Sequence, residues 1–419
     1  MRIKKTILLM AGLAVCIQMA TAAIIATKTQ LNQVMGVDVN DGCKVVFVKK
    51  ADNCAYFVDF SEANPSETRL CDTSPVISPL ISPDGSLVTF ESNGKVYAAK
   101  IEENATPQEI VTGFEPHWWI DPAESSTHIV YCTVSGKMSW PMPGSTFTQE
   151  IDPVALTATG SPVVLAGNAF TGGLSKSGKY LCHAYTDVVL YDLTKPKEYI
   201  LIGGVQACNP SITPTTDPLY ENQMMILTLG GTVDGTQYDM HEVFYVVNRY
   251  DQVLWYVENP YGTEQWQKPE WSTHPDFAIA TADRGGAYNV YIVKVWEEAS
   301  MVRVIDGDNT YPHLWVNSDT SNFIADHYRK EGLVQPGLVI SPNPADKKIF
   351  LILNRGMSRP ATRAVTLKVF TAEGDLVGTT AYRNTEDAMI LNTGAYQPGV
   401  YLIQVNTGSE TISSKILIQ

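Results

Sequence analysis

Three side chains that could work together chemically stand at matching positions of a recurring motif. His117, Glu270 and His313 lie in the segments 115–119, 268–272 and 311–315, which share a proline and an aromatic or apolar flank. Two imidazoles and a carboxylate are ligands that a divalent transition metal accepts. If the copies of the motif lie side by side, these side chains converge. The spacing therefore predicts one site assembled from distant segments, and Ser78 and Ser211 are further candidates for it.

Other motifs of catalysis and cofactor binding are absent from the sequence. It contains no Gly-x-Ser-x-Gly, no His-Glu-x-x-His, no phosphate-binding loop and no dinucleotide fingerprint. The segment 38–42 has the composition of a calcium loop, but no Glu stands at the twelfth position, so a turn is favoured. We therefore expect no cofactor, with a divalent metal at His117, Glu270 and His313 as the alternative.

The motif belongs to a repeat of about 40 residues. It is clearest at 77–101, where Ser-Pro-Asp-Gly precedes a strand, a Gly turn and a second strand, and copies begin near residues 36, 77, 115, 174, 209, 268 and 311. A four-stranded unit at this period is typical of a propeller blade. The sequence predicts an all-β chain with a β-propeller of seven four-stranded blades over residues 24–331. Six blades plus a degenerate copy are the alternative. The seventh copy lacks outer strands, and residues 26–31 are expected to supply one.

The repeats resemble those of TolB-like propellers, whose unit reads roughly Pro-x-Trp-Ser-Pro-Asp-Gly, a strand, a polar turn and Ile/Val-Tyr. The segments 82–85 with 96–97, and 269–272 with 290–291, match best. The resemblance implies innermost strands that line a central channel, and a tendency to bind partners. Some TolB-like lyases that act on uronate oligosaccharides place a metal in such a channel, where His117, Glu270 and His313 would lie. In the competing interpretation these side chains face channel water or bond neighbouring strands.

A second candidate site is aromatic. The long insertion of the fifth copy contains four rings, at Trp255, Tyr256, Tyr261 and Trp266. Exposed rings on a loop can stack on sugar faces or anchor a protein partner. The alternative is a loop that covers the edge of a blade.

The N-terminus carries an export signal. Residues 1–22 combine a basic start, an apolar run too short to span a bilayer and an Ala-Thr-Ala cleavage site, which indicates a secretory signal peptide. No later segment is apolar enough to span a membrane in the mature chain. In an exported chain the six remaining cysteines permit disulfides, and Cys43 and Cys54, which flank a hairpin, are the first expected pair. Cys132 and Cys182 fit buried thiols on inner strands.

The last part of the chain predicts a separate module. A linker at 332–337 precedes short alternating strands over 338–419, a pattern typical of a small Ig-like β-sandwich. The segments 341–344, 374–377, 391–394 and 398–402 resemble the C-terminal sorting domain of the type IX (Por) secretion system. The resemblance implies interaction of residues 338–419 with that machinery and delivery to the cell surface or beyond. Its motif residues in this chain are Pro342, Asn343, Pro344, Gly374, Gly399, Tyr401 and Lys415.

Charge and organisation together favour a binding protein. The formal net charge of -14 opposes binding to nucleic acid or anionic membranes. The leading hypothesis is an exported propeller, secreted or associated with the outer membrane, that binds a glycan or a surface protein. The alternative is a metal-dependent polysaccharide lyase or hydrolase with its site in the channel, and a purely structural surface protein is a third possibility.

Overall fold

The computed structural model divides into two compact units, Met1–Thr320 and Ser321–Gln419. It describes residues 24–136, 140–201, 207–216, 220–233, 236–249, 252–259, 265–284, 286–296, 300–317, 337–341, 348–354, 364–372, 374–383, 389–406 and 411–418. The predicted signal peptide and the linker at 332–336 lie outside these ranges. Within the described part of the chain, no helix is long and apolar enough to cross a membrane.

Six antiparallel sheets form the first unit, each running from an innermost strand outward. Blade 1 contains β25 (Asn309–Val316), β1 (Cys43–Lys49), β2 (Cys54–Asp59) and β3 (Thr68–Arg69), and blade 2 contains β4 (Ile77–Ile81), β5 (Leu87–Ser92), β6 (Lys95–Lys100) and β7 (Gln108–Thr112). Blade 3 contains β8 (Phe114–Ile120), β9 (Thr127–Cys132), β10 (Thr146–Asp152) and β11 (Thr157–Ala166), and blade 4 contains β12 (Tyr180–Tyr185), β13 (Asp187–Asp192) and β14 (Lys197–Leu201).

Blades 5 and 6 complete the set. Blade 5 contains β15 (Ala207–Ile212), β16 (Met224–Thr228), β19 (Val243–Asn248) and β20 (Gln252–Glu258), and blade 6 contains β21 (Trp266–Trp271), β22 (Phe277–Arg284), β23 (Ala287–Lys294) and β24 (Met301–Ile305). A hairpin of β17 (Gly231–Val233) and β18 (Thr236–Tyr238) lies between β16 and β19 in the chain. In blade 4 the innermost strand is reduced to Leu174, which bridges to Leu181 of β12.

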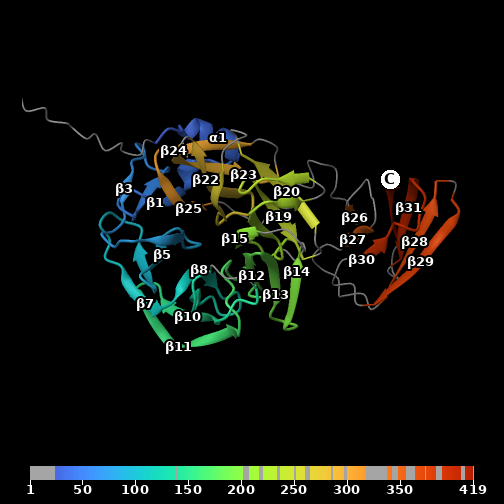
Figure 1. Cartoon of the computed structure of the whole chain (residues 1–419), viewed down its shortest axis with the longest axis horizontal. Coiled ribbons are helices and arrows are strands. Elements are labelled where there is room, and N and C mark those ends of the chain that lie inside the picture. Colours follow the sequence, from blue (N-terminus) through green and yellow to red (C-terminus); the bar gives the residue numbers. More distant parts are fainter. Residues whose placement is uncertain are drawn as a thin grey trace, which may run out of the picture. The chain divides into compact units, whose positions relative to one another are not determined.

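The six sheets surround a common centre (Figure 1) and close into a ring. Neighbouring innermost strands contact one another from β15 through β21, β25 and β4 to β8, and β15 also contacts β12, the second strand of blade 4. Between blades 3 and 4 the ring continues through the His117 ring, which bonds to the Thr171 carbonyl. Blade 1 is made from both ends of the unit, because β25 pairs with β1 from Cys43↔Val316 to Lys49↔Asn309. This fold is a β-propeller, in which ring closure protects the sheet edges.

The blade count is six within the described residues, which is the alternative that the sequence left open. The seventh copy is not a separate blade, because its strand β25 is the innermost strand of blade 1. The first copy uses β25 as its innermost strand, because its own opening residues form the short helix η1 (Val39–Asp41) rather than a strand. The expectation of an outer strand at 26–31 is wrong. Thr27 caps the helix α1 (Lys28–Met35) there, and only Ile24 extends blade 6 by a bridge to Ile305.

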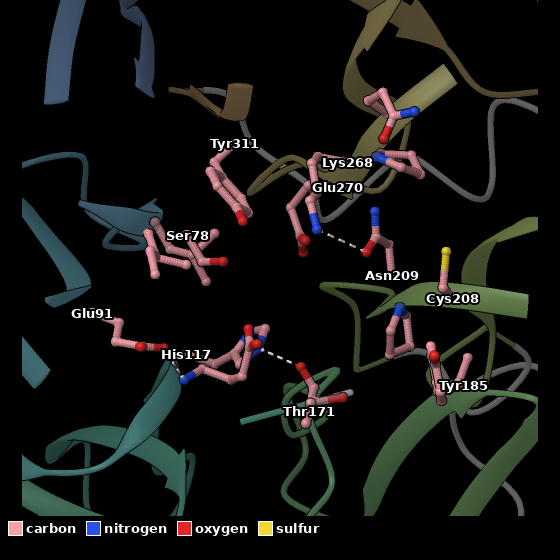
Figure 2. Close-up of a pocket in the computed structure, with 18 of the residues that line it drawn as sticks. Ser78, Glu91, His117, Thr171, Tyr185, Cys208, Asn209, Lys268, Glu270 and Tyr311 are labelled. Atoms are coloured by element: carbon pink, nitrogen blue, oxygen red, sulfur yellow. Dashed lines mark hydrogen bonds between the residues drawn. The ribbon is translucent and has the colours of Figure 1, made fainter. Parts of the chain in front are cut away.

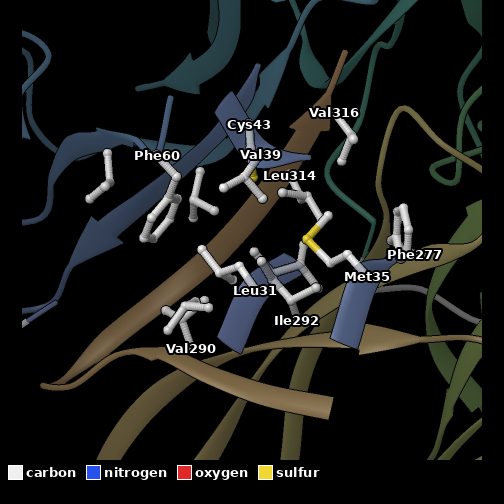
Figure 3. Packing of buried hydrophobic residues seen from close by; sticks show 14 of the residues in the cluster. Leu31, Met35, Val39, Cys43, Phe60, Phe277, Val290, Ile292, Leu314 and Val316 are labelled. Carbon is white, nitrogen blue, oxygen red and sulfur yellow. The ribbon is translucent and has the colours of Figure 1, made fainter. Parts of the chain in front are cut away.

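Helix α1 covers the seam between blades 1 and 6. Its side chains Leu31 and Met35 are buried against Phe60, Ile292 and Leu314, which come from both blades (Figure 3). Gly36 ends the helix in the left-handed conformation. The helix therefore supports the closing contact of the ring by burying apolar surface.

The repeated Asp-Gly turn has a packing role between blades. In blade 2, Leu87 N–H donates to Ser82 Oγ (2.9 Å) and Ser86 N–H donates to Asp84 Oδ1 (3.1 Å), which holds the turn closed. Gly85 (φ +75°) lies under the Trp315 ring of blade 1, and a Cβ there would be 2.2 Å from the ring. The glycine is needed both for its φ and for this close approach.

The cysteine prediction is wrong for the first pair. Cys43 and Cys54 begin the paired strands β1 and β2, so the antiparallel register places them at opposite ends of the hairpin. Both are free thiols and buried. Cys132 and Cys182 are buried free thiols, as the strand patterns predicted.

The second unit is a two-sheet sandwich, as predicted. One sheet has the order β26 (Gly337–Ser341), β27 (Lys348–Asn354), β30 (Met389–Asn392). The other has the order β29 (Leu376–Arg383), β28 (Ala364–Thr371), β31 (Gly399–Asn406), β32 (Thr411–Ile418). Leu351 and Leu391 from the first sheet share one core with Leu367, Ile403 and Ile416 from the second. Alternate residues of β28, β31 and β32 supply most of this core, which is the pattern of an Ig-like sandwich.

Candidate functional site

A backbone irregularity recurs on the innermost strands, directly before a proline. The residues concerned have φ between +46° and +51° and are Ser78, Glu115, Asn209, Lys268 and Tyr311. In all five of these blades the pairing between the innermost and the second strand slips by one residue at this point, as between Cys208 and Ser211. A bulge of this kind redirects side chains, and positive φ at residues other than glycine concentrates at binding sites.

These five side chains line one end of the channel. They surround a cavity of about 400 Å³, here called the polar cavity, to which Glu91 from the second strand of blade 2 also contributes (Figure 2). Glu115 N–H donates to Glu91 Oε2 (3.4 Å), so two acidic residues lie together on this side. Burial and the neighbouring Glu115 raise the pKa of Glu91 to about 7.

Lys268 lines the polar cavity from another side. Its Nζ donates to Asn209 Oδ1 (3.3 Å) and lies 4.8 Å from the centre of the Tyr311 ring. No carboxylate of the described residues pairs with it. Blades 3 and 6 are opposite each other in a ring of six, so Lys268 faces Glu115 across the channel. The cavity therefore has an acidic side and a basic side.

Two positions further along each innermost strand the channel has a narrow level, here called the waist. Its members are Leu80, His117, Gly173, Ser211, Glu270 and His313, one from each blade. The structure thus places four of the predicted channel residues, His117, Ser211, Glu270 and His313, at one level. Ser78 is not among them, because Leu80 has the equivalent position in blade 2 and Ser78 lies in the polar cavity.

Both waist histidines are neutral. Ile81 N–H donates to His313 Nδ1 (3.0 Å), so the proton of the neutral ring is on Nε2. His117 Nε2–H donates to the Thr171 carbonyl (3.0 Å), so its proton is also on Nε2. Burial lowers the pKa of His313 to about 3, with a contribution from His117, and burial lowers the pKa of His117 to about 4.

Glu270 is a neutral carboxyl group at neutral pH. Burial raises its pKa to about 8, and this outweighs the Ser211 hydroxyl, which donates to Glu270 Oε1 and favours the charged form. Ser211 Oγ in turn accepts from Trp271 N–H (3.1 Å). The side chain is therefore oriented by a chain of two hydrogen bonds.

The waist is poorly arranged for a metal ion. Among the described residues, no three His, Cys, Asp or Glu side chains come together in a way that could hold one. His117 lies three blades from Glu270 and two from His313. The lone pair of His313 Nδ1 accepts from Ile81 N–H and its Nε2 carries the proton, so this neutral ring has no nitrogen lone pair left for a metal. The residues present do not fit the metal that the lyase resemblance implies.

Sequence reasoning missed a thiol–imidazole pair in the polar cavity. Cys208 Sγ and His241 Nε2 are 3.7 Å apart, and Gln267 Nε2 lies 2.9 Å from His241 Nδ1. Burial raises the pKa of Cys208 to about 11 and lowers the pKa of His241, so the pair is neutral. The three residues come from separate elements with unrelated spacing, and no sequence signal could have found them.

The four predicted aromatic residues do not form a single exposed surface. Trp266 is 0% exposed in β21 and packs edge-on against Phe244, so it belongs to the core. Trp255 is half-buried beside Trp296, whereas Tyr256 is 51% exposed. Tyr261 lies outside the described residues. Instead of an aromatic loop, the described part of this segment is largely the strands β20 and β21 of two adjacent blades.

The predicted sorting residues fall partly within the described sandwich. Gly374 (φ +96°) lies in the turn between β28 and β29, and Gly399 begins β31. Tyr401 is buried and its hydroxyl donates to the Gln397 carbonyl (2.8 Å), while Lys415 is exposed on β32. Pro342, Asn343 and Pro344 lie outside the described residues.

Comparison with known families identifies the C-terminal module. Residues 339–419 match the family described as the secretion system C-terminal sorting domain. This is the type IX sorting domain that the sequence motifs indicated, and it implies secretion to the cell surface or beyond. A search of curated proteins finds no match to the chain.

Several solved structures are similar to the chain at low sequence identity. A protein described as TolB from Agrobacterium tumefaciens is 14% identical with a TM-score of 0.39, covering 65% of this chain and 97% of its own. PorZ, a surface component of the type IX secretion system of Porphyromonas gingivalis, is 9% identical with a TM-score of 0.32, covering 89% of this chain and 50% of its own. A protein of unknown function from Bacteroides caccae is 8% identical with a TM-score of 0.40, covering 66% of this chain and all of its own. Sheet topology and the family match together describe an exported six-bladed propeller that carries a type IX C-terminal sorting domain.

Proposed function

We propose that the exported propeller is a binding protein and that the polar cavity is its ligand site. One observation carries this proposal: Lys268, which has no carboxylate partner among the described residues, faces the Glu91–Glu115 pair across the cavity. Separated charges that the protein leaves without mutual neutralisation can be complemented by a ligand of matching charge layout. The cavity of about 400 Å³ is within the range of small-molecule sites.

The charge layout selects a class of ligand. The acidic side suits an ammonium or guanidinium group, and the basic side suits a carboxylate. A polypeptide terminus or a short peptide segment of a surface partner carries both groups. A neutral glycan offers a charged group to neither side, so a peptide partner is favoured over a glycan.

Calorimetric titration of the full mature chain tests the proposal. The probe is triglycine, which has one ammonium and one carboxylate group, and its matched control is the same peptide acetylated and amidated at its ends. We expect the free peptide to bind at least about tenfold more tightly, which corresponds to about 1.4 kcal/mol. Lys268→Met and Glu115→Gln should each remove most of that difference, whereas Lys100→Met, an exposed lysine of β6, should not.

Other outcomes would contradict the proposal. Equal affinity for the free and capped peptides would show that the charges are not used. Binding of maltotriose with no binding of either peptide would make the cavity a glycan site.

A further inference from the structure

We infer that the opposite end of the channel is a second binding site, which takes a small, flat, mainly apolar ring compound that presents a carbonyl or carboxylate oxygen to His313. Nothing in the proposed peptide binding depends on this site. Three features of the site support it: the apolar wall of the cavity, the His313 donor that faces it, and the small number of acceptors that are still open to a ligand.

The site is a cavity of about 260 Å³, here called the aromatic cavity. The innermost strands run in the same direction, and the residues after the waist line this cavity, whereas those before the waist line the polar cavity. Leu80, His117 and Glu270 border both. The waist therefore separates two chambers of one channel.

The wall of the aromatic cavity is mostly apolar. It is lined by Trp118, Trp119 and Trp271, together with Ile81, Ile120 and Ile212; Trp118 and Trp119 are half-buried, whereas Trp271 is 2% exposed. Indole faces favour flat rings through stacking, and aliphatic side chains favour apolar surface. The charged side chains that line it are Lys176, which is exposed, and Glu270, which is neutral at neutral pH.

His313 provides a buried hydrogen-bond donor without a partner. It is 6% exposed and lines the aromatic cavity but not the polar one. Because Ile81 N–H occupies Nδ1, Nε2 carries the proton, and no acceptor of the described residues lies within bonding distance of it. Nε2 is open to the cavity, and a hydrogen bond from it to a ligand oxygen would contribute about 0.5–1.5 kcal/mol to binding.

Most of the hydroxyl groups of the wall already accept a hydrogen bond. Ser211 Oγ accepts from Trp271 N–H (3.1 Å), Ser272 Oγ accepts from His274 N–H (2.9 Å), and Thr273 Oγ1 accepts from Val316 N–H (3.1 Å). Thr213 is 1% exposed and its hydroxyl donates to the Tyr220 carbonyl (2.5 Å). Glu270 Oε1 accepts from Ser211. Two further nitrogen atoms of the wall residues, Nε1 of Trp119 and Nε1 of Trp271, are buried without a hydrogen-bond partner, and both are donors.

His117 is the exception, and its position limits its use. Its Nδ1 is a free acceptor, but the ring lies against Gly173, where an added Cβ would be 2.8 Å from Nδ1. A polyhydroxylated sugar needs several acceptors for its hydroxyl protons, and this wall offers few. A carbonyl or carboxylate oxygen needs only donors.

Three probes of the same size test the ligand class on the full mature chain. These are 2-naphthoate, methyl 2-naphthoate and 2-methylnaphthalene, titrated by equilibrium dialysis. We expect at least one of the two oxygen-bearing probes to bind about three- to tenfold more tightly than the hydrocarbon, the effect of one hydrogen bond. Preference for the acid over the ester would assign a carboxylate ligand, and the reverse would assign a neutral carbonyl compound.

Two substitutions of His313 isolate the donor. His313→Asn keeps an acceptor near the position of Nδ1 for Ile81 and removes the Nε2 donor, whereas His313→Gln can place an amide N–H near Nε2. We expect His313→Asn to lose the preference for the oxygen-bearing probe and His313→Gln to retain part of it, with far-ultraviolet circular dichroism showing that both fold. Absence of binding by all three probes, equal binding of the hydrocarbon, or an unchanged preference in His313→Asn would overturn the inference. Triglycine should not displace a bound probe, so this site can fail while the polar cavity stands.

Discussion

Replacing Glu270 by Gln should make the stability of the propeller less dependent on pH. In the folded protein burial raises the pKa of this carboxyl group from 4.5 to about 8. Gln resembles the protonated acid, and its side-chain oxygen can still accept from the Ser211 hydroxyl. The two proteins should therefore have similar stability in acid and diverge as the pH rises.

The sign and size of the effect follow from linkage. Below pH 4.5 the carboxyl group is protonated in both the folded and the unfolded chain, so it adds no pH dependence. Between pH 4.5 and 8 the unfolded chain ionises while the folded chain keeps the proton, so the wild type loses about 1.4 kcal/mol per pH unit. The pKa of about 8 therefore sets an upper limit of about 5 kcal/mol on the advantage of Glu270→Gln above pH 8.

Urea unfolding between pH 5 and pH 8.5, followed by tryptophan fluorescence, measures this difference. All eight tryptophans lie between residues 118 and 315, so the signal reports on the propeller and not on the sandwich. Glu91, whose pKa is also raised, is present in both proteins, so its contribution to the pH dependence cancels in the comparison. Glu103→Gln, at an exposed position, is the control and should follow the wild type.

One result would refute the reasoning. If the unfolding free energies of the wild type and Glu270→Gln run parallel from pH 5 to pH 8.5, Glu270 is charged in the folded channel. The neutral waist described above would then be incorrect.

Three further predictions concern packing, access and export. Gly85→Ala should lower the free energy of unfolding in urea by at least about 2 kcal/mol, because its Cβ would lie 2.2 Å from the Trp315 ring. Gly167→Ala is the control and should change the free energy little, because nothing lies within 4 Å of its Cβ. Equal losses in the two variants would contradict the packing role of Gly85. Cys208 is the one half-exposed cysteine among the described residues, so it should be the first thiol alkylated by iodoacetamide. Excess triglycine should slow this alkylation, which mass spectrometry of peptides measures. Faster alkylation of another cysteine would count against the place of Cys208 in the polar cavity. Deletion of residues 338–419 should leave the propeller in the periplasm, and its appearance in the medium in cell fractionation would disprove the sorting role.

Much of the fold could be read from local patterns. The turn at 82–85 is made by side-chain bonds to nearby backbone N–H groups, so its residues predict it directly. Strands such as β12, β22 and β31 follow from runs of apolar, β-branched and aromatic residues; β31 alternates in burial, whereas β12 and β22 are buried on both faces. The sandwich was also predictable, because all of its strands pair within one stretch of about 80 residues.

The channel was only partly predictable. The recurring proline located His117, Glu270 and His313 on equivalent strands, since equivalent positions of a repeat meet at one level of a propeller. Counted from the end of the innermost strand, the Pro-Asp pair of the turn stands two residues later in blade 6 (275–276) than in blade 2 (83–84), so alignment on that pair placed Ser78 where Leu80 belongs.

The repeat, the strands and turns within each copy, and the C-terminal sorting module are all encoded locally, because they depend on contacts between residues close in the chain. The number of blades is not, since a ring of six requires the pairing of β25 with β1 across almost the whole unit. The chemistry of the channel is equally non-local. The charge state of Glu270, the tautomer of His313 and the opposition of Lys268 to Glu91 arise from burial and from partners on other blades, which no local pattern encodes.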